Sequence, residues 1–217
     1  MKKFKKILIS AGPTREKIDP VRFITNRSSG KMGYALAEKA TDFAEKTVLV
    51  SGPVNLEIPR NVQCINIESA AEMADAMFKE SSDADLIIMC AAVADYRPKF
   101  IHDTKMKKSD GDLTLVLERT TDILKTLGEN KKTGQIIAGF AAETNDILEN
   151  AQSKLERKNL DFIIANDVSS SSQGGFAKDV NAVTIIDRSG HREIFELCSK
   201  KELAGKILEY ITGHVRN

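Results

Sequence analysis

The chain has 217 residues, of which 41% are hydrophobic and 29% are charged, a composition that supports a globular core and excludes a disordered protein. Lys and Arg total 32 against 31 Asp and Glu, so the net charge of +1 argues against a dedicated nucleic-acid or membrane-surface binder. No apolar run reaches the roughly 18–20 residues of a membrane span, and the 3 cysteines and 3 histidines are too scattered for a zinc ribbon, a disulfide framework or a His-based metal site.

Short apolar runs alternate with helical patterns along the chain. In chain order, the pattern predicts a strand over Ile7–Ala11, a helix over Lys31–Phe43, strands over Thr47–Val50 and Val62–Ile67, and a helix capped by Ser69. It continues with strands over Leu86–Ala92 and Leu113–Leu117, a helix over Asp122–Leu127, a strand over Ile136–Phe140 and a helix over Asp146–Lys158. The last elements are a strand over Phe162–Ala165, a hairpin of Ala182–Ile186 with Glu193–Leu197, and a helix over Ser199–Ile211.

This alternation predicts an α/β fold, organised as a single domain over residues 1–217. Continuous apolar strands separated by helices are typical of a parallel sheet covered on both faces, and the late hairpin predicts antiparallel strands at one edge. Two polar segments, Arg97–Asp112 and Asp167–Asn181, are too long for simple connections and are expected to be functional or disordered loops. The basic N-terminus has too short an apolar run for a signal peptide, which makes the cytoplasm the expected compartment.

Polar and small residues follow four of the predicted strands. The segments are SAGPTREKIDPVRFITNRSSGKMG, AAVADYRP, AAET and NDVS. Because ligands of open parallel sheets bind outside the carboxyl ends of the strands, these segments predict a site for a polar ligand at one edge of the sheet.

The Ser28-Ser29-Gly30 segment directly precedes a predicted helix. Small residues let backbone N–H groups approach an anion and a helix N-terminus favours negative charge, so a bound phosphate is one interpretation. The other is an ordinary Ser-capped helix with a glycine for close packing. The segment is not a P-loop, because Met32 stands where Ser or Thr would hold magnesium. The first strand also lacks the G-x-G-x-x-G of dinucleotide sites.

Charged side chains outside that segment each allow two interpretations. The run Lys105-Met106-Lys107-Lys108 is either a solvated surface or a lid whose lysines close over a polyphosphate. Asp95 follows the most apolar strand, and it either holds magnesium or a sugar hydroxyl or caps a turn. Lys154 and Lys158 are four residues apart and therefore share one face of a predicted helix.

Six motifs, in a fixed order, carry a resemblance to a known family from residue 7 to about residue 204. They are ISAGPTREKIDPVRFITNRSSGKMGYALAEKA, CAAVADYRP, KMKK, GFAAET, KNLDFIIANDV and SKKELA. The chain resembles phosphopantothenate–cysteine ligases, in the stand-alone bacterial form without the flavin-dependent decarboxylase domain that many relatives carry in front. The resemblance implies a Rossmann-like, mostly parallel sheet with helices on both faces and an antiparallel edge hairpin.

The reaction implied by this resemblance joins 4′-phosphopantothenate and cysteine in coenzyme A biosynthesis, through an acyl-CMP intermediate, with release of pyrophosphate and CMP. CTP is the expected co-substrate, Mg²⁺ the expected metal and a homodimer the expected assembly, with no nucleic-acid or membrane partner. The bacterial form of the GKMG segment favours CTP over ATP by analogy.

By motif, the resemblance assigns catalytic roles to Arg22, Asn26, Ala92 and Lys105. Asn26 is expected to donate to a developing oxyanion, Arg22 to bind phosphopantothenate, and Lys105 to act as a lid lysine on the triphosphate. The residues expected to bind the nucleotide are Met89, Cys90, Ala91, Asp95, Lys105, Thr121, Asp122, Ile123, Leu124, Phe140, Lys154 and Lys158. The substrate phosphate is expected on Ser28, Ser29 and Gly30. No direct metal ligand is assigned, with Asp95 as the one candidate.

Two departures and two alternatives accompany this assignment. Arg27 stands where many bacterial relatives have His, and Thr121 stands where many have Pro. One alternative is an NAD(P)-dependent reductase, but its Y-x-x-x-K pair is missing, since none of the 3 tyrosines is followed by a lysine at that spacing. The other is a non-catalytic nucleotide-binding module, against which the lysine-rich loop and the Asn26 segment argue.

Overall fold

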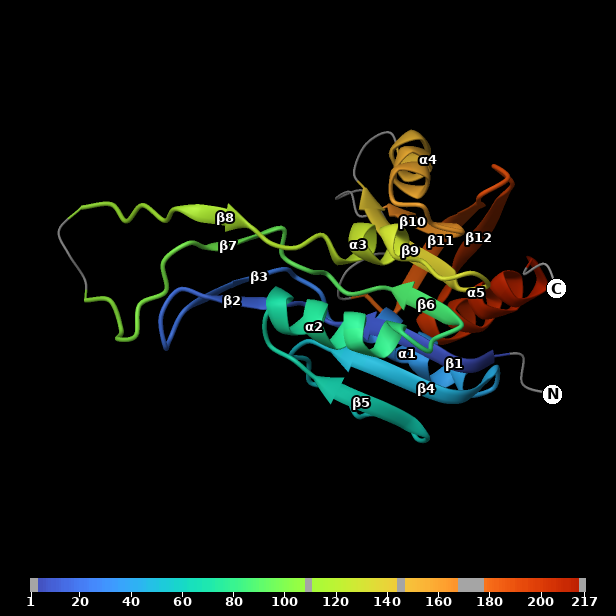
Figure 1. Ribbon diagram of the computed structural model, residues 1–217, viewed down its shortest axis with the longest axis horizontal. Helices are drawn as coiled ribbons and strands as arrows, with labels where there is room; N and C mark the ends of the chain where they lie inside the picture. The colour runs from blue at the N-terminus through green and yellow to red at the C-terminus, as the bar shows by residue number, and fades with distance from the viewer. Residues whose placement is uncertain (1–3, 108–110, 144–146, 168–177, 215–217) are drawn as a thin grey trace.

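The computed structural model describes residues 4–107, 111–143, 147–167 and 178–214. One sheet of eight strands forms its centre, in the order β12-β11-β10-β9-β6-β1-β4-β5 (Figure 1). Its strands are β1 (Phe4–Ala11), β4 (Ala44–Ser51), β5 (Val62–Asn66), β6 (Leu86–Met89), β9 (Ile136–Glu143), β10 (Phe162–Asp167), β11 (Val180–Asp187) and β12 (Arg192–Ser199). The helices are α1 (Lys31–Ala40), α2 (Ala70–Ser81), α3 (Ile123–Glu129), α4 (Ile147–Arg157) and α5 (Lys200–His214).

The six strands from β5 to β10 are parallel, and β11 and β12 continue the sheet as an antiparallel hairpin at its edge. Chain order along the parallel part reverses between β1 and β6, as in Rossmann-type sheets. Such a reversal separates the connections on either side of it and opens a crevice at the carboxyl ends of the two strands. The fold therefore predicts where a ligand binds before any side chain is considered.

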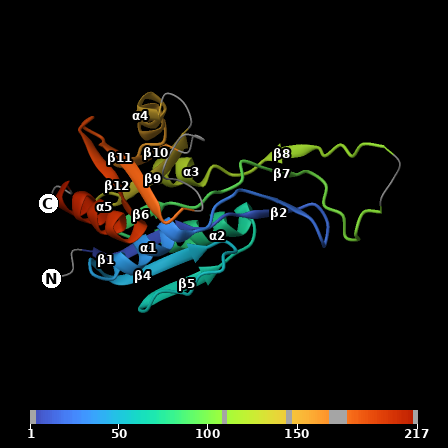
Figure 2. The same ribbon diagram turned by 180° about the vertical axis from the view of Figure 1, so that it is seen from behind.

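Alternate residues of the central strands pack into two hydrophobic layers. Ile7 and Ile9 of β1 pack in the layer that contains α1 and α5, and Leu8 packs in the opposite layer with α2, α3 and α4. Figures 1 and 2 show these two groups of helices on opposite faces of the sheet. Burial on both faces explains why the strands are continuous apolar runs in the sequence.

A long arm projects from the carboxyl-end edge of the sheet, at the opposite end of the molecule from both termini (Figure 2). It contains two small antiparallel ribbons, β2 (Arg15–Lys17) with β3 (Phe23–Thr25) and β7 (Tyr96–Pro98) with β8 (Leu117–Arg119). Eight of the twelve exposed large hydrophobic residues in the described chain lie on this arm. They are Val21, Phe23, Tyr96, Phe100, Ile101, Leu113, Val116 and Leu117.

The predicted α/β architecture, its two covered faces and its edge hairpin are confirmed. The predicted strand over Leu113–Leu117 is wrong, because only Leu117 belongs to a strand and the preceding residues extend along the arm without joining the main sheet. The hairpin of β2 and β3 was not predicted. Residues 108–110 of the lysine-rich loop and residues 168–177 of the second long loop lie outside the described residues.

Candidate active site

Hydrogen bonds join the ends of β1 and β6 at the reversal of strand order. Ser10 Oγ accepts from the backbone N–H groups of Cys90 and Ala91, both at 3.2 Å. Ala92 N–H donates to the Gly12 carbonyl at 2.9 Å. These contacts fix the small residues Ala91 and Ala92 in place, and their lack of bulk leaves their backbone open to a ligand.

A cleft of about 820 Å³, here called the basic cleft, opens on one side of these two alanines. Its lining comes from the loops after β3 and β6, the β8–α3 connection, β9 and α4. The lining residues are Asn26, Arg27, Met89, Ala91, Ala92, Val93, Asp95, Tyr96, Arg119, Thr120, Thr121, Asp122, Ile123, Leu124, Phe140, Lys154 and Lys158. It has both apolar and cationic walls, which suits a ligand with a flat apolar part and a negatively charged part.

The charge of the basic cleft is positive. Four cationic side chains (Arg27, Arg119, Lys154 and Lys158) face two carboxylates, Asp95 and Asp122. Asp122 caps the N-terminus of α3 by accepting from the Lys125 N–H at 3.0 Å.

Lys158 links α4 to that cap, because its Nζ donates to Asp122 Oδ1 at 2.8 Å. Burial alone would raise the pKa of Asp122, but the hydrogen bonds from Lys158 and the Lys125 N–H lower it on balance, so the carboxylate stays ionised at neutral pH.

Asn26 lies at the junction between the basic cleft and the β1–β6 reversal. Its amide nitrogen donates to the carbonyls of Ala92 at 3.0 Å and Val93 at 3.2 Å. The side chain therefore holds the loop after β6 against the loop before α1. To donate to a reacting oxyanion, it would exchange one of these two hydrogen bonds for the ligand.

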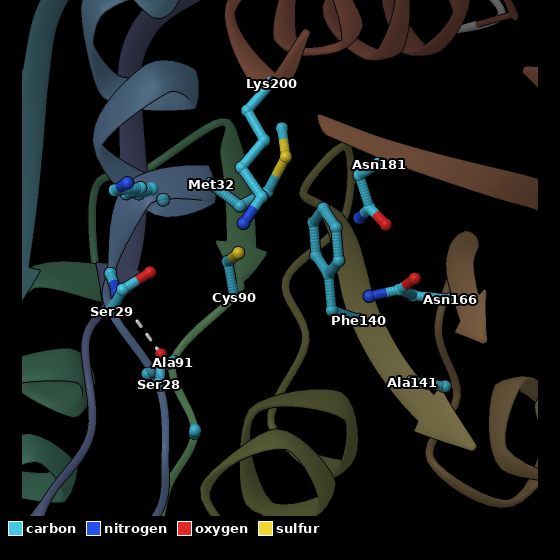
Figure 3. Close-up of a pocket in the computed structure, with 14 residues that line it drawn as sticks. Ser28, Ser29, Met32, Cys90, Ala91, Phe140, Ala141, Asn166, Asn181 and Lys200 are labelled. Atoms are coloured by element: carbon cyan, nitrogen blue, oxygen red, sulfur yellow. Dashed lines mark hydrogen bonds between the residues drawn. The ribbon is translucent and has the colours of Figure 1, made fainter. Parts of the chain in front are cut away.

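A second cavity, of about 110 Å³ and here called the Lys200 pocket, lies at the N-terminal ends of α1 and α5 (Figure 3). Its lining residues are Ser28, Ser29, Gly30, Lys31, Met32, Gly33, Cys90, Ala91, Ala92, Phe140, Ala141, Asn166, Asn181 and Lys200. Ala91, Ala92 and Phe140 also line the basic cleft, so the two cavities are neighbours. Gly30 has φ of +75° and gives α1 no side-chain cap, which leaves its first-turn N–H groups accessible from this pocket.

The predicted site residues fall into three places. Most of the predicted nucleotide residues, together with Asn26 and Ala92, line the basic cleft. Ser28, Ser29, Gly30 and Cys90 line the Lys200 pocket, so Cys90 lies beside the predicted phosphate segment rather than in the basic cleft. Arg22 and Lys105 line neither cavity. They belong to the arm, where Arg22 lies between β2 and β3 and Lys105 lies between β7 and β8.

On the arm, a buried carboxylate joins the Arg22 turn to the lysine-rich loop. Asp19 accepts from the Arg22 guanidinium and from the N–H groups of Val21, Arg22 and Met106. The Arg22 guanidinium and these N–H groups hold the pKa of Asp19 well below its usual range. Arg22 also donates to the Met106 carbonyl, so Arg22 and the residue next to Lys105 are in direct contact.

Sequence reasoning missed several residues of these cavities. Arg119 of the basic cleft carries no local signal, because it ends a three-residue strand of the arm. Asn166 lies in a strand end that had been identified as polar, and Lys200 lies in the SKKELA motif, but no role was assigned to either. Asn181 begins the antiparallel hairpin and comes near the other residues only through the fold.

Contact between α3 and the end of α4 positions Lys158, and it predicts a stability effect. A Cβ added at Gly128 would lie 1.8 Å from the Lys158 carbonyl oxygen, so Gly128→Ala must push the two helices apart. We expect this change to lower the free energy of unfolding by about 1–3 kcal/mol, as overpacking does. Urea unfolding measures it.

Gly205→Ala in α5 is the matched control for Gly128→Ala. An added Cβ there meets nothing within 4 Å, so the better helix propensity of alanine should raise the stability instead. A Gly128→Ala protein as stable as the wild type would contradict the close contact.

Among residues 4–107, 111–143, 147–167 and 178–214, no cluster of three or more His, Cys, Asp or Glu side chains is arranged to hold a metal ion. Within the same ranges, no helix has the length and apolar character to cross a membrane.

Residues 2–214 match the model of the family described as DNA/pantothenate metabolism flavoprotein C-terminal domain. The coenzyme A biosynthesis bifunctional protein CoaBC of Bacillus subtilis is 51% identical over 210 residues, which are 96% of this chain and 51% of that protein. The chain thus spans about half the length of this curated relative.

Solved structures agree with the family match. The crystal structure of a C-terminal domain of CoaBC superposes with a TM-score of 0.83 at 46% identity, covering 98% of this chain and 96% of that one. A Cab2 mutant in complex with phosphopantothenate-cysteine has a TM-score of 0.76 over 96% of this chain and 86% of its own, and at 16% identity it shows the shared fold alone. The chain therefore belongs to the family of DNA/pantothenate metabolism flavoprotein C-terminal domains.

Proposed function

We propose that this chain is a ligase that joins 4′-phosphopantothenate to cysteine in coenzyme A biosynthesis, with CTP as co-substrate and in the cytoplasm. The relative from Bacillus subtilis carries coenzyme A biosynthesis in its name, and the related Cab2 fold was crystallised with phosphopantothenate-cysteine. In the first step, a carboxylate oxygen of phosphopantothenate attacks the α-phosphorus of CTP and pyrophosphate leaves. In the second, the cysteine nitrogen attacks the acyl carbon, and CMP leaves with the electron pair of the broken C–O bond.

The basic cleft is the observation that carries this proposal. Its excess of cationic side chains over carboxylates suits a triphosphate, and Phe140 with Ile123 and Leu124 supplies apolar surface for a base. The cleft opens at the strand-order reversal, where open α/β sheets bind nucleotides.

The position of these residues in the cleft supports the following roles. We assign Lys154 and Lys158 to the phosphates, and Asn26 to the reacting carboxyl group beside Ala92. Because Asp122 is engaged by Lys158, Asp95 is the carboxylate that would hold a Mg²⁺ ion brought by the triphosphate. Such an ion would neutralise negative charge on the phosphate oxygens.

The phosphate of phosphopantothenate is assigned to the Ser28–Gly30 segment, where the N-terminus of α1 favours an anion. We assign Arg22 and Lys105 to a site shared between two copies of the chain. The exposed apolar residues of the arm support a homodimer, because a solvent-exposed surface of that kind marks an interaction site. A two-fold partner that covers one arm would bring its own arm toward the neighbouring site.

Pyrophosphate release without cysteine tests the proposed function. With CTP and phosphopantothenate alone, we expect release of about one equivalent of pyrophosphate per site, because the first half-reaction stops at acyl-CMP. Added cysteine should convert this burst into continuous turnover. ATP should support a lower rate than CTP, and an ATP rate equal to or above the CTP rate would contradict the nucleotide assignment.

The same assay separates the alternatives. Oxidation of NADPH would favour the reductase, and nucleotide binding without pyrophosphate release would favour the binding module. Burial raises the pKa of the Cys90 thiol to about 12, so this cysteine stays protonated and is no nucleophile at neutral pH. A covalent acyl-enzyme detected by mass would therefore contradict the mechanism.

A further inference from the structure

Asp19 connects two segments of the arm that are far apart in the sequence. It lies in the turn between β2 and β3, and its side chain is completely buried although most of the arm is exposed. The loop after β7 lies against this turn (Figure 1), and its Met106 N–H donates to Asp19 Oδ2 at 3.2 Å. Arg22 Nη2 donates to the same Oδ2 and, at 3.3 Å, to the Met106 carbonyl. One carboxylate therefore contacts both Arg22 and the residue next to Lys105.

The two oxygens of Asp19 have different partners. Oδ1 accepts from the backbone N–H groups of Val21 at 2.8 Å and Arg22 at 2.9 Å, contacts that stabilise the turn itself. Oδ2 accepts from the Arg22 side chain, through Nε at 3.0 Å and through Nη2, and from the Met106 N–H. Oδ1 thus shapes the turn, whereas Oδ2 connects the turn to the lysine-rich loop.

Pairing with Asp19 fixes the direction of the Arg22 guanidinium. Nε and Nη2 both face the carboxylate, so the guanidinium cannot turn away without breaking two hydrogen bonds. Nη1 makes no hydrogen bond to the described residues of the chain, and the Arg22 side chain is 42% exposed. One edge of the guanidinium therefore stays available to an anion while the other is held in place.

Stability alone does not account for the buried charge of Asp19. Removing a carboxylate from water costs free energy, and apolar residues of similar size are often at least as stable as a buried ion pair. What the carboxylate with its donors provides is one defined geometry. The strands of the arm have only three residues each, so few other backbone contacts hold its segments together.

We propose that Asp19 is a positioning residue of the ligase reaction, which holds the Arg22 guanidinium and the start of the lysine-rich loop in the geometry in which Arg22 and Lys105 act. This role rests on the ligase function proposed above and on the assignment of Arg22 and Lys105 to it. Asp19 lines neither the basic cleft nor the Lys200 pocket, so it acts through these two residues and not on a substrate.

Asp19→Asn breaks the connection between the segments and keeps the turn. Its Oδ1 can still accept from Val21 and Arg22, but the NH₂ group in place of Oδ2 accepts no hydrogen bond. We expect trypsin to cleave after Lys105 about 10- to 100-fold faster, because losing a hydrogen bond to a charged group shifts the opening of the loop by that factor. Mass spectrometry identifies the cleavage site. This measurement uses no substrate and is independent of the ligase function.

Binding and chemistry should both weaken in Asp19→Asn. The Kd for phosphopantothenate is expected to rise about 10- to 100-fold through Arg22, the effect of a lost hydrogen bond to a charged group. Single-turnover pyrophosphate release at saturating substrates is expected to slow about 10- to 100-fold through Lys105, as it does when a catalytic group is displaced. Adding Asp19→Asn to Lys105→Gln should slow release no further, and adding it to Arg22→Ala should not raise the Kd further.

Asp103→Asn is the matched control, because Asp103 is an exposed carboxylate of the same loop, two residues before Lys105. It removes the same charge from the arm and should keep the wild-type cleavage rate, Kd and rate of pyrophosphate release. Urea unfolding should show equal stability for the wild type and both variants, because the arm lies outside the main sheet.

Arg22→Lys tests the connection without changing the buried carboxylate, which matters if Asp19→Asn does not fold. A lysine lacks the planar fork that contacts Asp19 and the Met106 carbonyl together, so cleavage after Lys105 should again be faster. Wild-type cleavage in this variant would overturn the connection through Arg22.

Four results with Asp19→Asn would overturn the proposal. Wild-type cleavage would show that the contact does not hold the loop, and faster cleavage with wild-type Kd and rate would show a purely structural contact. A loss in only one of Kd and rate, or a further loss on top of Lys105→Gln, would show that Asp19 does not act through both residues. Tighter binding or faster release would show that the contact restrains the arm. No pyrophosphate burst in the wild type would overturn the ligase function, and the positioning role with it, whatever the cleavage result.

Discussion

Lys105→Gln is expected to lower the rate of pyrophosphate release from CTP and phosphopantothenate about 10²–10³-fold. Removing a single group that stabilises charge developing in a transition state typically lowers the rate by this factor. Lys105 is exposed on the arm, so its replacement should not change the stability of the fold. The measurement is single-turnover pyrophosphate release at saturating substrates, which separates the rate of chemistry from binding.

Lys99→Gln is the control for Lys105→Gln, because Lys99, directly after β7, is also an exposed lysine of the arm. It should keep the wild-type rate, and urea unfolding should show equal stability for all three proteins. Near-normal turnover by Lys105→Gln would remove Lys105 from the catalytic residues. A loss of the same size in Lys99→Gln would show instead that the net charge of the arm matters.

The main sheet could be predicted from the sequence because its strands are buried on both faces. Runs such as Leu86–Ala92 have no polar interruption, and that pattern occurs when helices cover both sides of a parallel strand. Element ends were less accurate, since helix α1 ends at Ala40 where the apolar spacing had continued to Phe43. Asn26, Asp95 and Phe140 were expected at one edge of the sheet, and they line the basic cleft together because the fold brings the strand ends to that edge.

The arm could not be predicted, and the physical reason is local. Its strands have only three residues each, too few for a clear alternation. Its order comes from contacts between distant segments, such as the buried Asp19 that accepts from Met106 N–H. Leu113–Leu117 alternates like a half-buried strand, but the arm leaves Leu113 and Val116 exposed.

The Lys200 pocket was missed for a different reason. Its polar side chains Asn166, Asn181 and Lys200 come from β10, β11 and the start of α5, and no local sequence pattern links them. Each of these residues alone is unremarkable in sequence, because a lysine at a helix start or an asparagine in a strand has several ordinary explanations. Only the shared cavity distinguishes them.

Arg22→Ala and Lys105→Ala are each expected to be nearly inactive alone, and a mixture of the two is expected to regain about a quarter of the wild-type activity. Arg22 lies on the arm beside the lysine-rich loop and lines neither cavity of its own chain. In the proposed homodimer, Arg22 of one chain acts at the site whose Lys105 belongs to the other chain. Random exchange of equal amounts makes about half of the dimers mixed.

Each mixed dimer then has one site with both residues intact and one site with both replaced, which gives the quarter. If Arg22 acts within its own chain, every site has one substituted residue and the mixture stays inactive. That result would contradict the shared site but not the ligase function. Subunit exchange has to be confirmed independently, by differently tagged chains that purify together. The exposed side chains of Val21 and Phe23, on either side of Arg22, support the shared site. A partner chain that covered them would hold the Arg22 turn against the neighbouring site.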